Sequence, residues 1–264
     1  MATILFPTDF SETANNAFLY ALNLAKVFNT DIRLITLKTH LNSYADLSED
    51  EFNIKVNELK QTAINAGLGD VLIRSSLEFG ELVLTVLDII NKENVHYIVM
   101  GTNGENNLDK KVFGSQTISV INNSSVPVLA IPNKVEYKKE RKFAFATLFD
   151  KKEDKALEEI MKIVKTHNAH LNVIHIEKKS PTIDTILERR EWSLNFPEID
   201  VDIIKDEDPE MAILDFCDQN KIDVLGIVHR DLNIFERFFT KNFSSKLLTK
   251  ANFALFVLRE DHKK

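Results

Sequence analysis

The residues best placed to do chemistry are three glycines and a serine that surround one loop. Gly101, Gly104, Gly114 and Ser115 form the pattern Gly-x2-Gly-x9-Gly-Ser, and the pattern follows a short apolar run over residues 97–100. Glycines directly after a strand let the backbone turn sharply and approach a ligand, and the N–H groups at a helix N-terminus attract phosphate oxygens. Because three of the seven glycines fall here, the spacing favours a phosphate-binding loop over a simple helix cap.

The segments around this loop alternate between strand and helix. Apolar runs at 4–6, 34–37, 71–73, 97–100 and 126–131 predict strands, and helical periodicity follows Ser11, Ser48, Glu81 and Ser115. Ser11 fits an N-cap, Ser48 and Glu51 fit a capping box, and Gly67 fits the end of that helix. This order predicts right-handed crossovers and a parallel sheet covered by helices on both faces, with ligands beyond the C-terminal ends of the strands.

The chain contains an internal repeat. Residues 29–35 resemble residues 168–174 at an offset of 139, and residues 126–131 resemble residues 253–258 at an offset of 127. Two constant offsets predict a duplicated domain whose second copy lost about a dozen residues around its second helix. Residues 133–142 are polar and aperiodic and form the expected linker. We therefore expect two tandem doubly wound parallel-sheet α/β domains, at residues 1–133 and 142–264.

Composition excludes several classes of protein. The 33 basic and 40 acidic residues give a net charge of -7, which lacks the cationic excess that nucleic-acid binding uses. Cys217 is the single cysteine, so the chain has no internal disulfide and no cysteine-based zinc site. No apolar run is long enough to cross a bilayer, and the first residues lack a basic leader. We expect a soluble cytoplasmic protein without nucleic-acid or membrane partners.

The motif, together with the segments at both ends of the first half, resembles a known family. The first predicted strand ends in Pro7-Thr8-Asp9, and the last begins Val126-Pro127-Val128-Leu129. In this combination the first half resembles the ATP-binding branch of the universal stress protein family. The resemblance implies a Rossmann-like fold of the adenine nucleotide alpha hydrolase type, with ATP or a related adenine nucleotide, alone or with Mg, as the ligand. It also implies a stress-response role with a protein partner that the sequence does not name.

The resemblance assigns roles to single residues. Asp9 matches an acidic residue that approaches the nucleoside, although its carboxylate also suits an N-cap of the first helix. Leu37 matches a residue that packs near the base, although a core position explains it as well. Gly101, Gly104, Gly114 and Ser115 match the phosphate-loop residues. Positive charge for a triphosphate rests on Lys110 and Lys111, which equally suit a solvated loop face.

The second half departs from this pattern. The 127 offset places Val228, Asp231, Lys241 and Asn242 opposite the four motif residues, and the 139 offset places Leu148 opposite Asp9. A side chain at each glycine position opposes close backbone approach, so we expect a degenerate domain that binds no ATP in this way. The resemblance also implies that the two halves pair as an intramolecular pseudo-dimer, the counterpart of a homodimer.

No catalytic machinery is visible in the sequence. The Walker loop, the nucleophile elbow and the zinc-protease motif are all missing, so no catalytic residue is assigned. His167, His170 and His175 run from a helix end into a strand, where their side chains should diverge, so no metal site is expected. Trp192 falls in a stretch without periodicity. The favoured function is ATP binding with nucleotide sensing. An interaction scaffold with vestigial sites and a slow ATP hydrolase are the alternatives.

Overall fold

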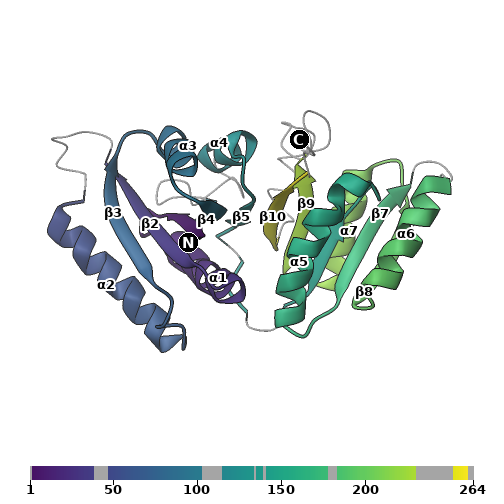
Figure 1. The fold of residues 1–264 in the computed structure, drawn as a ribbon, viewed down its shortest axis with the longest axis horizontal. Helices are drawn as coiled ribbons and strands as arrows, with labels where there is room; N and C mark the ends of the chain where they lie inside the picture. Colours follow the sequence, from purple (N-terminus) through teal and green to yellow (C-terminus); the bar gives the residue numbers. More distant parts are fainter. Residues whose placement is uncertain are drawn as a thin grey trace. The chain divides into compact units, whose positions relative to one another are not determined.

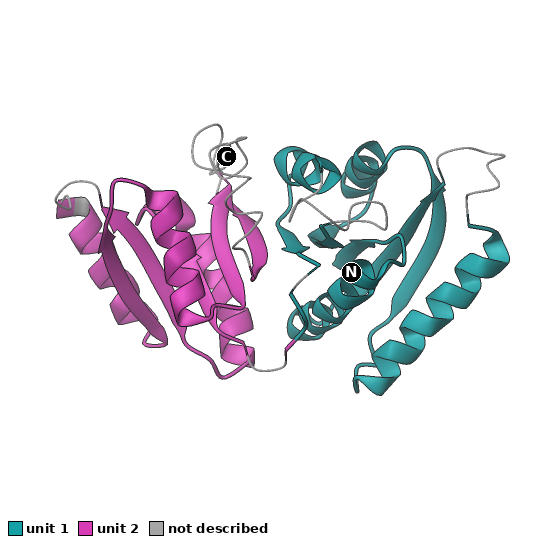
Figure 2. Cartoon of the chain, turned by 180° about the vertical axis from the view of Figure 1, so that it is seen from behind, with its two compact units in different colours: residues 1–137 teal, residues 138–264 magenta. Residues whose placement is uncertain are grey.

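The structure is a computed structural model that describes residues 2–38, 47–102, 115–133, 135–138, 141–177, 183–229 and 252–260. The chain divides into two compact units, Met1–Tyr137 and Lys138–Lys264 (Figure 2). This division falls inside the polar stretch 133–142 that the sequence marks as a linker.

Unit 1 is a five-stranded parallel sheet with helices on both faces. Its elements are β1 (Thr3–Pro7), α1 (Glu12–Phe28), β2 (Asp31–Lys38), α2 (Glu49–Asn65), β3 (Ile73–Phe79), α3 (Leu82–Lys92), β4 (Val95–Gly101), α4 (Ser115–Asn123) and β5 (Val128–Ile131). The strand order within the unit is β3-β2-β1-β4-β5, and every pairing is parallel. Helices α1 and α2 cover one face of the sheet, and α3 and α4 cover the other (Figure 1). The predicted doubly wound α/β fold is confirmed.

Unit 2 repeats this architecture. Its elements are β6 (Phe143–Ala146), a 3-10 turn (Lys151–Glu153), α5 (Asp154–Thr166), β7 (Leu171–Glu177), α6 (Ile183–Asn195), β8 (Ile199–Lys205), α7 (Pro209–Asn220), β9 (Val224–His229) and β10 (Ala254–Arg259). The strand order is β8-β7-β6-β9-β10, again parallel throughout. The order matches that of unit 1 strand for strand.

Strand register reproduces the offsets found in the sequence. Ile4 pairs with Ile32 and Tyr97 in unit 1, and Phe143 pairs with Leu171 and Val224 in unit 2. These pairs preserve the offset of 139 for the first two strands and 127 for the fourth. The change of offset falls between the second and third strands, because α2 and its flanking segments are longer than α6 and its flanking segments. The register thus supports a duplication with a deletion around the second helix.

The helix ends in unit 1 follow from the capping residues. Ser11 is the N-cap of α1, and its side chain accepts from the backbone N–H of Ala14. Ser48 and Glu51 form a complete capping box at the start of α2, and Gly67, with φ of 72°, follows the end of that helix. These predictions are confirmed, because caps depend on neighbouring residues only.

Two predicted features are wrong. The third strand begins at Ile73, the last residue of the predicted run, and continues to Phe79. Its alternating polar residues reflect its position at the outer edge of the unit's sheet. Trp192 lies on α6 and is buried, with 2% of its surface exposed. The weak amphipathicity of α6 hid this helix in the sequence.

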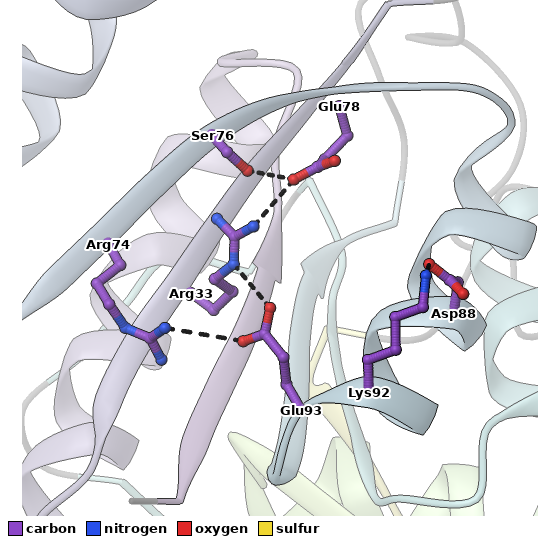
Figure 3. A network of polar contacts seen from close by, with 7 residues as sticks. All are labelled: Arg33, Arg74, Ser76, Glu78, Asp88, Lys92 and Glu93. Atoms are coloured by element: carbon purple, nitrogen blue, oxygen red, sulfur yellow. Dashed lines mark hydrogen bonds and ion pairs between the residues drawn. The ribbon is translucent and has the colours of Figure 1, made fainter.

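An ion-pair network connects the edge strand β3 to the rest of unit 1 (Figure 3). The Arg33 guanidinium on β2 lies 2.9 Å from the Glu78 carboxylate on β3 and 3.3 Å from the Glu93 carboxylate after α3. Arg74 lies 3.8 Å from Glu93, and the Ser76 hydroxyl donates to Glu78. Two arginines and two glutamates compensate one another, so the network stabilises the edge strand rather than offering net charge to a ligand.

Each end of the linker is held on its own unit. In unit 1, the Asn16 side chain on α1 donates to the carbonyl of Val135 at 2.5 Å and accepts from the N–H of Tyr137 at 2.9 Å. In unit 2, the Asp223 carboxylate accepts from the N–H of Lys142 at 2.9 Å and lies 2.7 Å from the Lys138 ammonium. These bonds hold Val135 and Tyr137 on unit 1, and Lys138 and Lys142 on unit 2.

Candidate functional site

The strands that carry the motif meet at the point where the strand order of unit 1 reverses. The chain runs outward from β1 to β2 and β3, then crosses to β4 and β5 on the other side. The neighbouring strands β1 and β4 therefore end beside each other, with Asp9 following β1 and Thr102 following β4. Parallel α/β sheets bind ligands at this reversal.

The turn after β1 has a specific geometry. Phe10 has a φ of 60°, which is uncommon for a bulky residue. Its N–H donates to the Thr8 hydroxyl at 2.9 Å, and the N–H of Ser11 donates to the Asp9 carboxylate at 3.0 Å. Asp9 is exposed, and Ser11 rather than Asp9 is the N-cap of α1. The alternative role of Asp9 as an N-cap is therefore wrong, and its carboxylate faces solvent at the end of the sheet.

Gly101 has a structural reason to be glycine. A Cβ at this position would lie 3.1 Å from the Thr13 Cγ2 and 3.2 Å from both the Ala14 nitrogen and the Thr13 carbonyl carbon. Two of these neighbours are backbone atoms of α1, which cannot move aside independently of the helix. The glycine therefore allows the end of β4 to pack directly against the first turn of α1.

The start of α4 folds back onto the end of β4. The Thr117 hydroxyl on α4 lies 3.5 Å from the Gly101 carbonyl and 3.4 Å from the Thr102 carbonyl. Ser115 is exposed at the first position of the helix. The first turn of α4, which begins at Ser115, thus contacts the end of β4, where Gly101 lies. Gly104, Gly114, Lys110 and Lys111 lie outside the described residues.

Thr102 and Leu37 add two features to this end of the sheet. Thr102 is 2% exposed, and its hydroxyl is a buried polar group that finds no hydrogen-bond partner in the described part of the chain. Leu37 lies near the end of β2 and is partly buried, so a contact with a base and a core position both stay predictions. Sequence reasoning missed Thr102 because a threonine after a strand carries no signal of its own.

In unit 2, the Glu153 side chain accepts hydrogen bonds from the corresponding turn, the one after β6. The Thr147 hydroxyl accepts from the N–H of Phe149 at 2.8 Å, as Thr8 does for Phe10, and Phe149 has a φ of 54°. Here the buried Glu153 carboxylate also accepts from the N–H of Leu148 at 3.2 Å, the N–H of Asp150 at 3.4 Å and the Thr147 hydroxyl at 2.5 Å. Ala14 occupies the matching position in unit 1 and carries no such group.

The other motif positions of unit 2 are only partly described. Val228 lies on β9 and is buried, with 7% of its surface exposed. It pairs with Leu258 as Gly101 pairs with Ile131, which confirms its correspondence with the glycine. Asp231, Lys241, Asn242 and the loop 232–239 lie outside the described residues.

His167, His170 and His175 of unit 2 lie in different surroundings. His167 caps the end of α5, His170 is exposed and lies 3.6 Å from the Asp200 carboxylate, and His175 is buried on β7 with its Nδ1 2.9 Å from the Thr147 carbonyl. In the described ranges, no group of three His, Cys, Asp or Glu side chains is arranged to hold a metal ion. Over the same residues, no helix has the length and apolar character needed to span a membrane.

Comparison with known proteins identifies the family. The model of the universal stress protein family matches residues 1–132. Universal stress protein MJ0577 of Methanocaldococcus jannaschii is 30% identical over 153 residues, which cover 50% of this chain and 94% of that protein. Universal stress protein MJ0531 of the same organism is 26% identical over 48% of this chain and 80% of its own length. The chain therefore belongs to the universal stress protein family.

Solved structures extend the likeness to the whole chain. A universal stress protein from Archaeoglobus fulgidus covers 99% of this chain and 97% of its own, with a TM-score of 0.70 and 19% identity. A protein from Pseudomonas aeruginosa described as a putative universal stress protein covers 98% of this chain and 93% of its own, with a TM-score of 0.69 and 16% identity. At these identities the likeness establishes the fold of both units.

Proposed function

We propose that the chain binds one molecule of ATP at the C-terminal edge of the unit 1 sheet and that nucleotide occupancy is its signal in a cytoplasmic stress response. The observation that carries the proposal is the contact between the end of β4 and the first turn of α4 at the reversal of strand order, where the Thr117 hydroxyl lies 3.5 Å from the Gly101 carbonyl and 3.4 Å from the Thr102 carbonyl. Phosphate oxygens are bound well by backbone N–H groups and hydroxyls at a helix N-terminus.

The described residues fit an adenine nucleotide in distinct ways. Ser115 offers a hydroxyl at the first position of α4, and the buried Thr102 hydroxyl has no protein partner among the described residues. Asp9 is exposed on the adjacent strand end and suits the hydroxyl groups of a ribose, because an ionised carboxylate accepts two hydrogen bonds. The partly buried Leu37 offers an apolar contact for the base.

The difference between the two units supports a single site. Unit 2 places Leu148 where unit 1 has Asp9, and buried Val228 where unit 1 has Gly101. The Glu153 carboxylate also occupies the turn after β6 and accepts its N–H groups. An anionic phosphate would meet a second negative charge there, so we place the nucleotide in unit 1 alone.

The described part of the site favours binding over turnover. Its one ionisable group is the exposed Asp9 carboxylate, and a general acid or base pair needs a second group with a shifted pKa nearby. We therefore propose a nucleotide-sensing role, with hydrolysis slow if it occurs, and a protein partner that responds to the occupied state.

We also propose that the two units pair through their closing strands. Within unit 1, β5 pairs with β4, and within unit 2, β10 pairs with β9. All four residues of β5 are buried, as are most residues of β10. An apolar edge strand exposes unpaired N–H and C=O groups, and pairing with the duplicate strand satisfies them.

Isothermal titration of the full-length protein with ATP, with and without Mg, tests the nucleotide proposal. We expect about one ATP per chain and weaker binding for Ser115→Ala, by about 0.5–1.5 kcal/mol for one lost hydrogen bond. Ser193→Ala, an exposed serine on α6, is the matched control and should bind as the unmodified chain does. Two equivalent sites, or no saturable binding, would contradict the proposal.

A further inference from the structure

A pocket lies in unit 2, at the turn after β6. It has a volume of about 780 Å³ and is lined by residues of that turn (Leu148, Phe149, Asp150, Lys151) and of α6 (Leu187, Glu188, Arg190, Glu191, Leu194). The volume is within the range typical of small-molecule sites. The pocket follows the C-terminal end of a central strand, as binding sites in parallel sheets do. Figure 1 shows α5 and α6 on this side of the unit.

The apolar part of the lining is accessible. Leu148 is 42% exposed, Leu187 57% and Leu194 74%. Phe149 forms a closed wall beside them, because its ring packs against buried Trp192 with 5.3 Å between ring centroids. These exposed leucines and the Phe149 ring form an apolar surface that the apolar part of a ligand can pack against.

One charged group of the lining is buried. Glu188 is 6% exposed, yet no donor in the described part of the chain makes a hydrogen bond or ion pair with it. Burial raises the pKa of Glu188, and the carboxylates of Asp154, Glu191 and Asp150 raise it further, against the single favourable charge of Lys151. Because no described donor pairs with this carboxylate, a ligand that brings a cationic donor into the pocket gains a charged hydrogen bond there.

The charge of the pocket selects the ligand. Three carboxylates, from Asp150, Glu188 and Glu191, outnumber the two cations of Lys151 and Arg190. The carboxylate of this pocket does not correspond to the one at the unit 1 site. Asp9 follows β1, and Leu148 takes the matching position after β6, whereas Glu188 lies on α6. We propose that this pocket binds a small organic cation, a protonated amine on an apolar body, with the ammonium group on Glu188 and the body against Leu148, Leu187 and Phe149.

Trp192 provides a direct readout. It is the one tryptophan of the chain, it contacts Phe149 in the pocket wall, and its Nε1 donates to Asp154 at 2.9 Å. Binding of benzylammonium to the full-length protein should therefore change the tryptophan fluorescence and saturate. Benzyl alcohol and benzoate have similar apolar bodies with no charge and negative charge, and both should bind more weakly.

Glu188→Gln is the decisive variant, because it keeps the shape and removes the charge. We expect it to weaken benzylammonium binding by about ten- to a hundredfold, the loss of one charged hydrogen bond, and to remove the preference for the amine over the alcohol. The matched control is Glu158→Gln, an exposed carboxylate on α5 outside the pocket lining, for which we expect at most about a threefold loss. Equal binding of amine and alcohol, or unchanged binding by Glu188→Gln, would overturn the proposal.

The pH dependence gives a second measurement that does not rely on a variant. The ammonium group binds the ionised carboxylate, so affinity should rise with pH through the raised pKa of Glu188 and then level off. Asp154 from α5, Asp150 and Lys151 from the turn and Glu191 from α6 are the charged groups around it. Affinity that falls over this range would reject Glu188 as the partner. Added ATP should not displace the amine, so this test stands apart from that of the unit 1 site.

Discussion

Phe10 and Phe149 hold the same left-handed backbone conformation, with φ of 60° and 54°, at matching points of the two units. Each N–H donates to the hydroxyl of the threonine two residues earlier, at 2.9 Å and 2.8 Å. A bulky residue rarely adopts this conformation, so its recurrence at an offset of 139 residues is strong support for a duplicated ancestor. The turn persists in both units, while the residue after its threonine changes from Asp9 in unit 1 to Leu148 in unit 2.

Thr147→Val should destabilise unit 2 by about 1–3 kcal/mol, because it leaves the buried Glu153 carboxylate without its hydroxyl donor. Thr8→Val is the matched variant in unit 1. Thr8→Val should lower the free energy of unfolding by less than Thr147→Val does. Unit 1 has Ala14 at the position that corresponds to Glu153, so no carboxylate loses a donor. Urea unfolding of both variants measures the difference. Equal costs would show that Glu153 does not depend on Thr147.

Gly114→Val should weaken ATP binding by about 1–3 kcal/mol, about the cost of leaving a polar group unpaired, while the fold survives. The prediction rests on the sequence motif, in which Gly114 directly precedes α4. Lys241→Val changes the matched position of the second half and should leave ATP binding unaltered. Titration calorimetry measures both variants, and normal binding by Gly114→Val would reject the phosphate-loop interpretation.

His167 should make stability depend on pH. Burial lowers the pKa of His167, and the nearby Arg141 guanidinium lowers it further, against the Ile163 carbonyl that raises it. The unfolded chain therefore takes up a proton first as pH falls below about 6.5, the ordinary value. The free energy of unfolding should fall with pH from about 6.5 down to the lower pKa of the folded state and then level off.

Urea unfolding between pH 5 and 8 checks this dependence. Glu159 and Glu188, whose pKa values are raised mainly by burial, act in the opposite direction at lower pH, so the comparison must be made between variants. His167→Gln should reduce the slope of the free energy of unfolding against pH. His170→Gln, a change at an exposed residue, should leave that slope unchanged. Identical slopes in the unmodified chain and in His167→Gln would contradict the prediction.

Cys217 should resist thiol reagents in the folded protein. The residue is 1% exposed on α7, and burial raises the pKa of its thiol far above the usual range, so almost no reactive thiolate forms. Labelling should be slow in buffer and complete in urea, which makes the thiol a reporter of unfolding in unit 2. Rapid labelling under native conditions would show that α7 opens locally.

A fragment of residues 1–137 should associate with itself at micromolar concentration. Its closing strand β5 would keep an apolar edge and lose the duplicate strand with which we propose it pairs. Sedimentation measurements on the fragment and on the full-length chain test this expectation. A fragment that stays monomeric would refute pairing through the closing strands.

The sequence by itself determined the features that depend on neighbouring residues. The alternation of strands and helices, the caps at Ser11 and Ser48, and the two offsets of the repeat were all predicted correctly. Each depends on local periodicity or on a short motif, so it can be predicted without knowing which distant residues are in contact. The sequence likewise predicted a strand directly before the glycine motif and a helix that begins at Ser115, as the structure has them.

Only the tertiary structure decided what surrounds the individual side chains. It showed that Gly101 packs against the backbone of α1, and that the Thr102 hydroxyl is buried without a partner among the described residues. It also placed Glu188 and Trp192 of an unpredicted helix beside the turn after β6. These properties arise from contacts between segments far apart in the chain, and burial of a charge depends on all of those segments together.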